Sequence, residues 1–185
     1  MLRYGSEKGF SRQIEIEPSE DAERRFLSVG SSSKFIRGIF SRGILPSRSI
    51  SLVCFFQMLD HVPNPKEFLT SVYDVLEPGG VAVCVTHNTK ALTAKILGEK
   101  SPIFDIEHTY LYNPKNMAKL FEKAGMKSLE TFGVPNRYPL KYWFNLAPLP
   151  KSIKKPILPL TEKFKFFNMR LNVNFGNFGL IAQKL

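Results

Sequence analysis

Three groups of polar residues in this 185-residue chain directly follow segments that have the pattern of a β-strand. They are Glu17-Pro18-Ser19, the segment from Phe56 to His61, and Thr86-His87-Asn88. Ligands of open α/β sheets bind outside the carboxyl ends of the strands, so these groups are candidate site residues. His61 can act as a general base there, because an imidazole titrates near neutral pH. The alternative interpretation is a structural histidine that precedes a helix.

The segments that precede these groups predict three strands. Residues 13–17 (QIEIE) alternate polar and apolar side chains and end at Pro18, which is typical of a short strand. Residues 50–56 (ISLVCFF) and 81–86 (VAVCVT) are continuous apolar runs, as expected of strands buried on both faces. Both cysteines, Cys54 and Cys84, lie inside these runs, which indicates reduced core residues in a cytoplasmic protein.

Helix signals separate and follow these strands. Ser19 is placed to cap a helix over residues 20–28. Asn64 and Pro65, with Glu67 completing a capping box, begin a second helix that ends at the turn 77–80 (EPGG). The resulting strand–helix–turn–strand unit predicts a right-handed parallel crossover and an α/β class.

The last third of the chain predicts one more helix and two more strands. Asn113 and Pro114 begin the helix and Gly125 ends it. Residues 128–134 predict a strand, and residues 172–183 predict another that is interrupted by Gly176 and Gly179. No apolar stretch approaches the roughly 18 residues that span a bilayer, and the N-terminus lacks the apolar region of a secretory signal.

Four motifs, in this order, resemble those of class I S-adenosylmethionine-dependent methyltransferases, with the ubiquinone-biosynthesis O-methyltransferases as the most similar subgroup. The motifs are IEPSEDA, FFQMLDHVPNPKEFL, VLEPGGVAVCVTHN and IEHTYLYNPKNMAKLFEKAGM, and the terminal GNFGLIAQK resembles the antiparallel last strand of that family. The resemblance implies a Rossmann-like sandwich with a mostly parallel sheet. It also implies S-adenosylmethionine as cofactor and methyl transfer to a small-molecule or lipid-like acceptor.

The same resemblance implies roles for individual residues. Glu17 matches the acid that binds the cofactor ribose, although an exposed strand-end acid is the alternative. Phe56 and Gln57 match the strand end that flanks the cofactor, with simple core packing as the alternative for Phe56. Further matches near the substrate are Asp60, His61, His87 and His108.

Metal binding is not expected from this resemblance. In the ubiquinone-type subgroup, an acid at the position of Gln57 joins the pair that matches Asp60 and His61 in a metal site. A carboxylate, an amide and an imidazole form a poorer ligand set than two carboxylates and an imidazole, because one anionic charge is lost.

The chain also departs from the family pattern. It contains no D-x-G-x-G-x-G segment, it has Ser41 and Arg42 where the family carries an acidic pair, and it has Ser51 in place of an aspartate. The first strand of the family order 3-2-1-4-5-7-6 has no counterpart, so the strand at 50–56 should present an unpaired edge. The expectation is therefore an N-terminally truncated domain with weakened cofactor affinity. The alternative is a non-catalytic remnant or interaction module.

The chain carries a formal net charge of +10, and this charge is concentrated near the C-terminus. Residues 127–185 contain ten basic and two acidic side chains. We expect an irregular remnant at 1–12, an α/β core at 13–134, a basic lid or insertion rich in proline and aromatic residues at 135–170, and the terminal strand at 171–185. Pro156 and Pro159 should interrupt any long helix in the lid. Peripheral contact with an anionic membrane is a second alternative function, nucleic-acid binding is not expected, and the oligomeric state stays open.

Overall fold

The computed structural model describes residues 2–29, 33–104, 108–146 and 149–185, and the chain divides into the compact units Met1–Pro46 and Ser47–Leu185. The elements of the first unit are α1 (Leu2–Glu7), β1 (Ile14–Glu17), α2 (Glu20–Val29) and β2 (Lys34–Arg37). β1 and β2 are parallel and form a sheet of their own. The predicted strand and the helix after Ser19 are confirmed, and the Ser19 hydroxyl accepts a hydrogen bond from Ala22 N at 3.4 Å.

The first twelve residues, which were expected to be irregular, contain the short helix α1. Its last turn is extended by the backbone hydrogen bond from Lys8 N to Tyr4 O at 3.1 Å. The Lys8 ammonium also lies 5.5 Å from the centre of the Tyr4 ring. This cation–π pair has the i,i+4 spacing that stabilises a helix.

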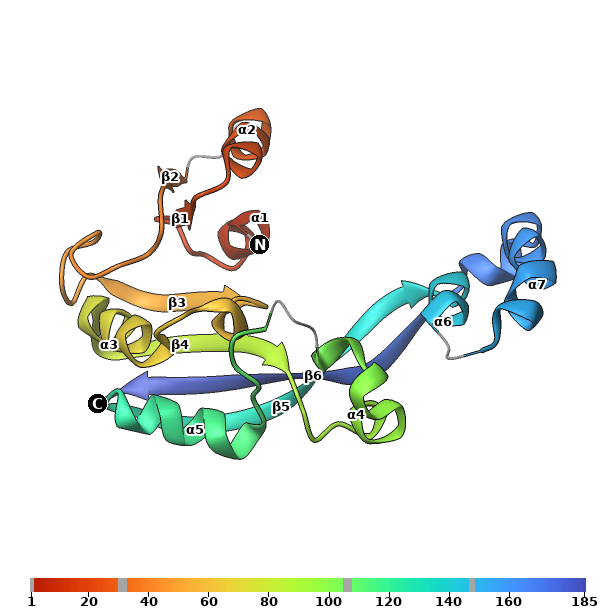
Figure 1. Cartoon of the computed structure of the whole chain (residues 1–185). Coiled ribbons are helices and arrows are strands. Elements are labelled where there is room, and N and C mark those ends of the chain that lie inside the picture. The colour runs from red at the N-terminus through yellow and green to blue at the C-terminus, as the bar shows by residue number, and fades with distance from the viewer. Residues whose placement is uncertain (1, 30–32, 105–107, 147–148) are drawn as a thin grey trace. The chain divides into compact units, whose positions relative to one another are not determined.

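The second unit is built on a four-stranded sheet of order β3-β4-β6-β5 (Figure 1). Its strands are β3 (Ile50–Phe56), β4 (Leu76–His87), β5 (Met126–Pro139) and β6 (Arg170–Lys184). β3 and β4 are parallel, whereas β6 lies antiparallel between β4 and β5. Three strands therefore share one direction and the last strand opposes them, which confirms the predicted α/β class with an antiparallel last strand. The observed order corresponds to the 4-5-7-6 half of the expected family order.

The helices α3 (Pro65–Val75) and α5 (Pro114–Lys123) begin with the same kind of cap. The Asn64 side chain accepts a hydrogen bond from Glu67 N at 3.4 Å, and the Asn113 side chain accepts two backbone N–H groups. The predicted capping box of α3 is half formed, because the Glu67 carboxylate accepts from the Asn64 side-chain amide at 2.9 Å. Both predicted helix starts are confirmed.

The core of this unit lies between the sheet and these two helices. The ring of Phe55 on β3 contacts Phe68 of α3 edge-on at 5.2 Å and stacks on Phe121 of α5 at 6.2 Å between ring centres. The fully buried side chains around it include Leu69, Val72, Leu76, Met117, Phe121 and Leu180. β6 runs as one strand through both glycines at which an interruption was predicted. At Gly176, where φ is 111°, only the register with β5 shifts, and Gly179 leaves room for the ring of Phe132 on β5.

β3 is an edge strand, and this position corrects the expectation that both its faces are buried. Only Phe55 of its seven residues is buried. Among the described residues no strand pairs with its outer edge, so the expected unpaired edge is confirmed. Cys54 is exposed, which contradicts its assignment to the core, whereas Cys84 on β4 is buried as expected. A strand with a neighbour on one side only buries fewer of its side chains.

Beyond the core, β5 and β6 continue as a two-stranded ribbon that carries helices at its end (Figure 1). The elements there are α6 (Leu140–Leu146), α7 (Lys151–Lys163) and the 3-10 helix η4 (Lys165–Asn168). We call residues 136–173 the arm. α6 contains the aromatic residues Tyr142, Trp143 and Phe144.

α7 runs through Pro156 and Pro159, so the expected interruption is wrong. A proline inside a helix removes one backbone hydrogen bond, here to the carbonyls of Ser152 and Lys155. Both prolines and both of these residues are exposed. Water can therefore hydrate the carbonyls that lose their helical partner, which lowers the cost of the interruption.

The C-terminal end of β6 caps helix α3 through a buried lysine. Lys184 Nζ donates hydrogen bonds to Tyr73 O and Leu76 O, both at 2.7 Å, and lies 4.3 Å from the centre of the Tyr73 ring. Burial lowers the pKa of this ammonium group. A cation at a helix C-terminus satisfies the last carbonyls and the negative end of the dipole, so this contact joins β6 to α3.

Candidate active site at the carboxyl end of the sheet

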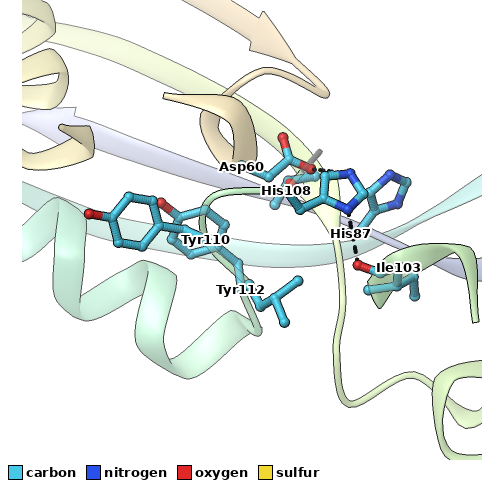
Figure 2. A pocket seen from close by; sticks show the side chains of 8 residues that line it. Asp60, His87, Ile103, His108, Tyr110 and Tyr112 are labelled. Carbon is cyan, nitrogen blue, oxygen red and sulfur yellow. Dashed lines mark hydrogen bonds and ion pairs between the residues drawn. The ribbon is translucent and has the colours of Figure 1, made fainter. Parts of the chain in front are cut away.

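Four residues that the sequence placed near a substrate lie together in the second unit: Asp60, His61, His87 and His108. Asp60 and His61 belong to the 3-10 helix η1 (Leu59–His61), which follows β3, and His87 is the last residue of β4. His108 lies in the segment that leads to α5. Figure 2 shows the ring of His108 between Asp60 and the Ile103 carbonyl, with the ring of His87 beside it. The expected juxtaposition of these residues is present, and their catalytic roles stay predictions.

Backbone hydrogen bonds hold the two segments that contribute Asp60 and His108. Gln57 adopts a left-handed conformation with φ of 49° and donates its N–H to Val85 O at 2.8 Å, which turns the chain after β3. The carbonyl of Asp60 then accepts hydrogen bonds from Thr109 N and Tyr110 N at 2.8 and 3.1 Å. The segment around His108 is therefore fixed directly to the residue whose side chain it faces.

Asp60 is the buried acid of the site, with 2% of its surface exposed. Its Oδ2 lies 3.6 Å from His108 Nε2, and its Oδ1 lies 4.0 Å from His61 Nε2. Within the described part of the chain neither carboxylate oxygen accepts a hydrogen bond, and the buried hydroxyl of Thr86 in the same pocket also has no partner. Buried polar atoms are normally hydrogen-bonded, so such a group is typical of a site that binds something.

The partners of the other ring nitrogens determine how two of the histidines face this acid. His108 Nδ1 lies 3.0 Å from the Ile103 carbonyl, which can only accept, so Nδ1 carries the proton. His87 Nδ1 lies 2.9 Å from Asn177 Oδ1, and the Asn177 amide donates to Asn136 Oδ1 at 3.1 Å. In their neutral forms both rings therefore present Nε2 as a lone pair.

Two further ionisable groups around Asp60 are held neutral by their surroundings. Burial raises the pKa of the Tyr112 phenol, and the Asp60 charge adds to the shift. Burial, followed by the Asp60 charge, also raises the pKa of the Cys84 thiol well above its usual value. The polar chemistry of this pocket therefore rests on the carboxylate and the imidazoles.

The space around these residues is divided into a tight pocket and an open groove. Asp60, Thr86, His87 and His108 line the pocket, which is packed too closely to admit a water molecule. A groove of about 380 Å³ lies along β5, β6 and the start of α4 (Leu92–Leu97), and its wall includes Asn88 and Asn177. Since Asn177 also binds His87, the groove begins at the edge of the histidine cluster.

Two of the cofactor residues expected from the resemblance, Phe56 and Gln57, belong to the same unit but are not part of this cluster. Phe56 and Gln57 lie at the carboxyl end of β3 and are exposed, and neither lines the pocket. Glu17 ends β1 in the first unit, so it belongs to a separate compact body. Their roles in cofactor binding stay predictions.

Sequence reasoning missed the residues that orient the histidines. Asn177 lies ninety positions after His87 and reaches it because the two residues are paired in the antiparallel register of β4 and β6. The Ile103 carbonyl acts through its backbone, in the 3-10 helix η3 (Pro102–Phe104) that follows η2 (Gly98–Lys100). No local motif marks either residue. The sequence signal for Asn177 is limited to a polar side chain within the otherwise apolar terminal strand.

The chain matches the family model described as "Methyltransferase domain" over residues 2–131, which is more than half of its length. It is 31% identical over 90 residues to a probable S-adenosylmethionine-dependent methyltransferase of Mycolicibacterium smegmatis, covering 49% of this chain and 34% of that protein. It is 28% identical over 85 residues to the ubiquinone biosynthesis O-methyltransferase of Dinoroseobacter shibae, covering 42% and 34%. The chain thus matches about a third of the length of these two curated relatives.

The solved structure of an S-adenosylmethionine-dependent methyltransferase from Archaeoglobus fulgidus has a similar fold. The TM-score is 0.63 at 17% sequence identity, over 99% of this chain and 80% of that one. The whole arm lies outside the residues that match the family model.

Proposed function

The chain belongs to the methyltransferase domain family of class I S-adenosylmethionine-dependent enzymes, and from this membership we propose that it transfers a methyl group from S-adenosylmethionine to a small acceptor. The observation that carries the proposal is the family match over residues 2–131, which contains Asp60, His61, His87 and His108. When bound, the cofactor supplies an electrophilic methyl group. The protein contributes mainly by holding the acceptor in line with it.

The residues present fit the cofactor in part. Phe56 offers an exposed aromatic surface, 38% accessible, at the carboxyl end of β3, and Gln57 offers an exposed amide beside it. Glu17 supplies a carboxylate at the end of β1 that suits ribose hydroxyls. A glycine-rich segment that would approach the cofactor closely has no counterpart in the sequence. We therefore propose that the chain binds the cofactor more weakly than a relative that carries this segment.

For the acceptor, we propose a small, largely apolar molecule with a hydroxyl group, bound in the groove beside Asn177. Phe132, Phe178 and Leu92 supply apolar surface, while Asn88 and Asn177 supply hydrogen-bonding groups. A mostly apolar cleft with a few polar groups is typical of small-molecule sites. The O-methyltransferase named for Dinoroseobacter shibae supports a hydroxyl acceptor. The role of His61 as a general base stays a prediction, and its side chain is 42% exposed.

Calorimetric titration of the whole chain with S-adenosylhomocysteine tests the cofactor proposal. We expect saturable binding that is weaker than in a relative with the glycine-rich segment, and a further loss in Glu17→Ala and Phe56→Ala. Glu15→Ala is the matched control, because Glu15 is the same residue type on the same strand and face but lies two residues before the carboxyl end that Glu17 forms. Absence of binding at millimolar ligand would contradict the proposal and favour an interaction module. Affinity equal to that of the relative would contradict the expected weakening.

The arm supports a second candidate function, contact with an anionic membrane surface. It carries eight basic side chains and one acidic side chain, together with exposed apolar residues such as Phe164, Phe166 and Met169, at 51%, 63% and 48%. Basic and aromatic side chains together favour binding at a lipid headgroup layer. No described helix has the length and apolar character needed to cross a bilayer, so the contact would be peripheral.

Co-sedimentation with vesicles of anionic and zwitterionic lipid tests this candidate. We expect binding to anionic vesicles at low salt, loss at high salt, and a reduction in the double variant Phe164→Ala, Phe166→Ala. Phe10→Ala serves as control, because Phe10 is 41% exposed and lies in the first unit. Failure to sediment with anionic vesicles at low salt would remove this function.

A further inference from the structure

We propose that Asp60, His61 and His108 form a binding site for a divalent transition-metal ion, with Zn²⁺ as the ion of choice. This proposal departs from the sequence-based expectation that no metal is bound. It also differs from the ligand set implied for the ubiquinone-type subgroup, which uses an acid at the position of Gln57. Gln57 is an exposed amide here and does not line the pocket. His108 supplies the third ligand instead.

The ligand atoms are already close to coordinating distance. One potential ligand atom from each of the three residues lies within 4.8 Å of the other two. A metal ion about 2.1 Å from each of two ligand atoms can bridge a separation of up to about 4.2 Å. The separations of 3.6 Å from His108 Nε2 to Asp60 Oδ2 and 4.0 Å from His61 Nε2 to Asp60 Oδ1 are within this limit. Small side-chain rotations would bring the third pair into range.

Electrostatics points to a positive charge between these groups. Asp60 is 2% exposed, and among the described residues its two oxygens accept no hydrogen bond. A carboxylate removed from water without a partner is costly, and it is usually paired or bound to a metal. Because the Ile103 carbonyl binds the Nδ1–H of His108, the neutral ring directs its Nε2 lone pair toward the Asp60 carboxylate. The lone pairs of Nε2 and of the carboxylate oxygen repel each other. A cation bound between the two atoms would replace this repulsion with two coordination bonds.

The surroundings of His108 have the form of a metal second shell. A metal-bound histidine usually donates its other ring N–H to a carbonyl or carboxylate, which fixes the ring and its tautomer. His108 Nδ1 makes this contact with the Ile103 carbonyl at 3.0 Å. The backbone bonds from Thr109 N and Tyr110 N to Asp60 O hold the His108 segment against the acid. The Ile103 carbonyl therefore fixes the His108 ring, and the Asp60 carbonyl fixes the backbone that follows His108.

The donor set selects the class of metal. Two imidazoles and one carboxylate suit Zn²⁺ and similar ions, whereas Mg²⁺ and Ca²⁺ prefer oxygen ligands. Three protein ligands leave one tetrahedral position open, as in catalytic zinc sites.

Calorimetry on the metal-stripped, tag-free full chain in a Cys54→Ser background tests the proposal, since the exposed thiol of Cys54 could bind metal on its own. We expect one Zn²⁺ per chain and no comparable binding of Mg²⁺. His108→Gln and Asp60→Asn should weaken Zn²⁺ binding by more than about 100-fold, beyond the 10–100-fold loss typical of outer-shell partners. His87→Gln, a neighbouring histidine outside the ligand set, should change affinity less than about threefold.

Co²⁺ substitution provides a second readout that does not depend on activity. We expect the visible absorption of a low-coordinate Co²⁺ site with two nitrogen ligands, lost in His108→Gln, and a Zn²⁺-dependent rise in Tm that is absent in the same variant. Circular dichroism of each variant separates loss of metal from loss of fold. Zn²⁺ binding that is absent, or unchanged in both His108→Gln and Asp60→Asn, would overturn the site. Neither outcome bears on cofactor binding, which is measured without metal.

Discussion

The two halves of β6 belong to the same strand but lie in different environments. From Gly176 to Lys184 its side chains alternate between buried and half-buried, with Phe178, Leu180 and Ala182 inside the core. From Arg170 to Asn174 they alternate between exposed and half-buried. The first of these halves lies between β4 and β5, whereas the arm half pairs with β5 and with no other described strand. The half of β6 that contributes to the core is therefore the half that pairs with β4 as well as with β5.

The same division separates the chemical groups of the protein. The core half places Asn177 opposite His87 and carries Lys184 to the end of α3. The arm half leads to a region with eight basic side chains and one acidic side chain. A buried strand holds groups at fixed positions, as a site requires, whereas an exposed ribbon presents charge and aromatic surface to a partner.

Truncating the same residue type in both halves should produce the largest contrast. Leu180→Ala removes a side chain with no exposed surface, so we expect the free energy of unfolding to fall by about 3 kcal/mol. Leu171→Ala, at a half-buried position in the arm, should cost less than about 1 kcal/mol. Urea unfolding followed by circular dichroism measures both. Equal losses would show that the arm contributes to the core as much as the sheet does.

A smaller effect is expected at the two cationic ends of β6. Lys184→Met removes two hydrogen bonds to the end of α3 and leaves the carbonyls of Tyr73 and Leu76 without this donor. We expect a loss of about 1–3 kcal/mol in the free energy of unfolding. The exposed Arg170→Met should change it by less than about 0.5 kcal/mol. A Lys184→Met protein as stable as the wild type would show that the cap is not needed.

The smallest effect is expected in the reactivity of the two thiols, which compares the exposed Cys54 on β3 with the buried Cys84 on β4. Partial burial raises the pKa of Cys54, and burial with the Asp60 charge raises that of Cys84 further. Only the thiolate reacts, so labelling of the native chain should be slow at pH 7 and faster at pH 9, and it should occur at Cys54 alone. Mass spectrometry of alkylated peptides measures this, with the urea-unfolded chain as control. Equal labelling of Cys84 in the native chain would contradict its burial.

Much of the secondary structure could be predicted, because its signals are local. Asn64 with Pro65 and Asn113 with Pro114 mark the starts of α3 and α5, and the apolar run at 50–56 marks β3. Burial could not be predicted in the same way. The run at 50–56 is as apolar as a central strand, yet within the part of the chain that the structure describes β3 pairs only with β4. The two prolines of α7 likewise predict a break in the helix when only the local sequence is considered. The helix continues through them because both positions are exposed and water can hydrate the carbonyls that lose a partner.

By itself, the sequence determined which residues follow the strands and could therefore meet at one edge of the sheet. Asp60, His61 and His87 were identified as candidates on that basis, and the resemblance added His108. Only the tertiary structure decided which ring nitrogen each histidine presents, because Asn177 and the Ile103 carbonyl reach them through strand register and loop packing. Contacts between residues far apart in the chain depend on which segments pair, and local patterns do not specify that pairing. The burial of the Asp60 carboxylate beside His61 and His108 is a consequence of this packing.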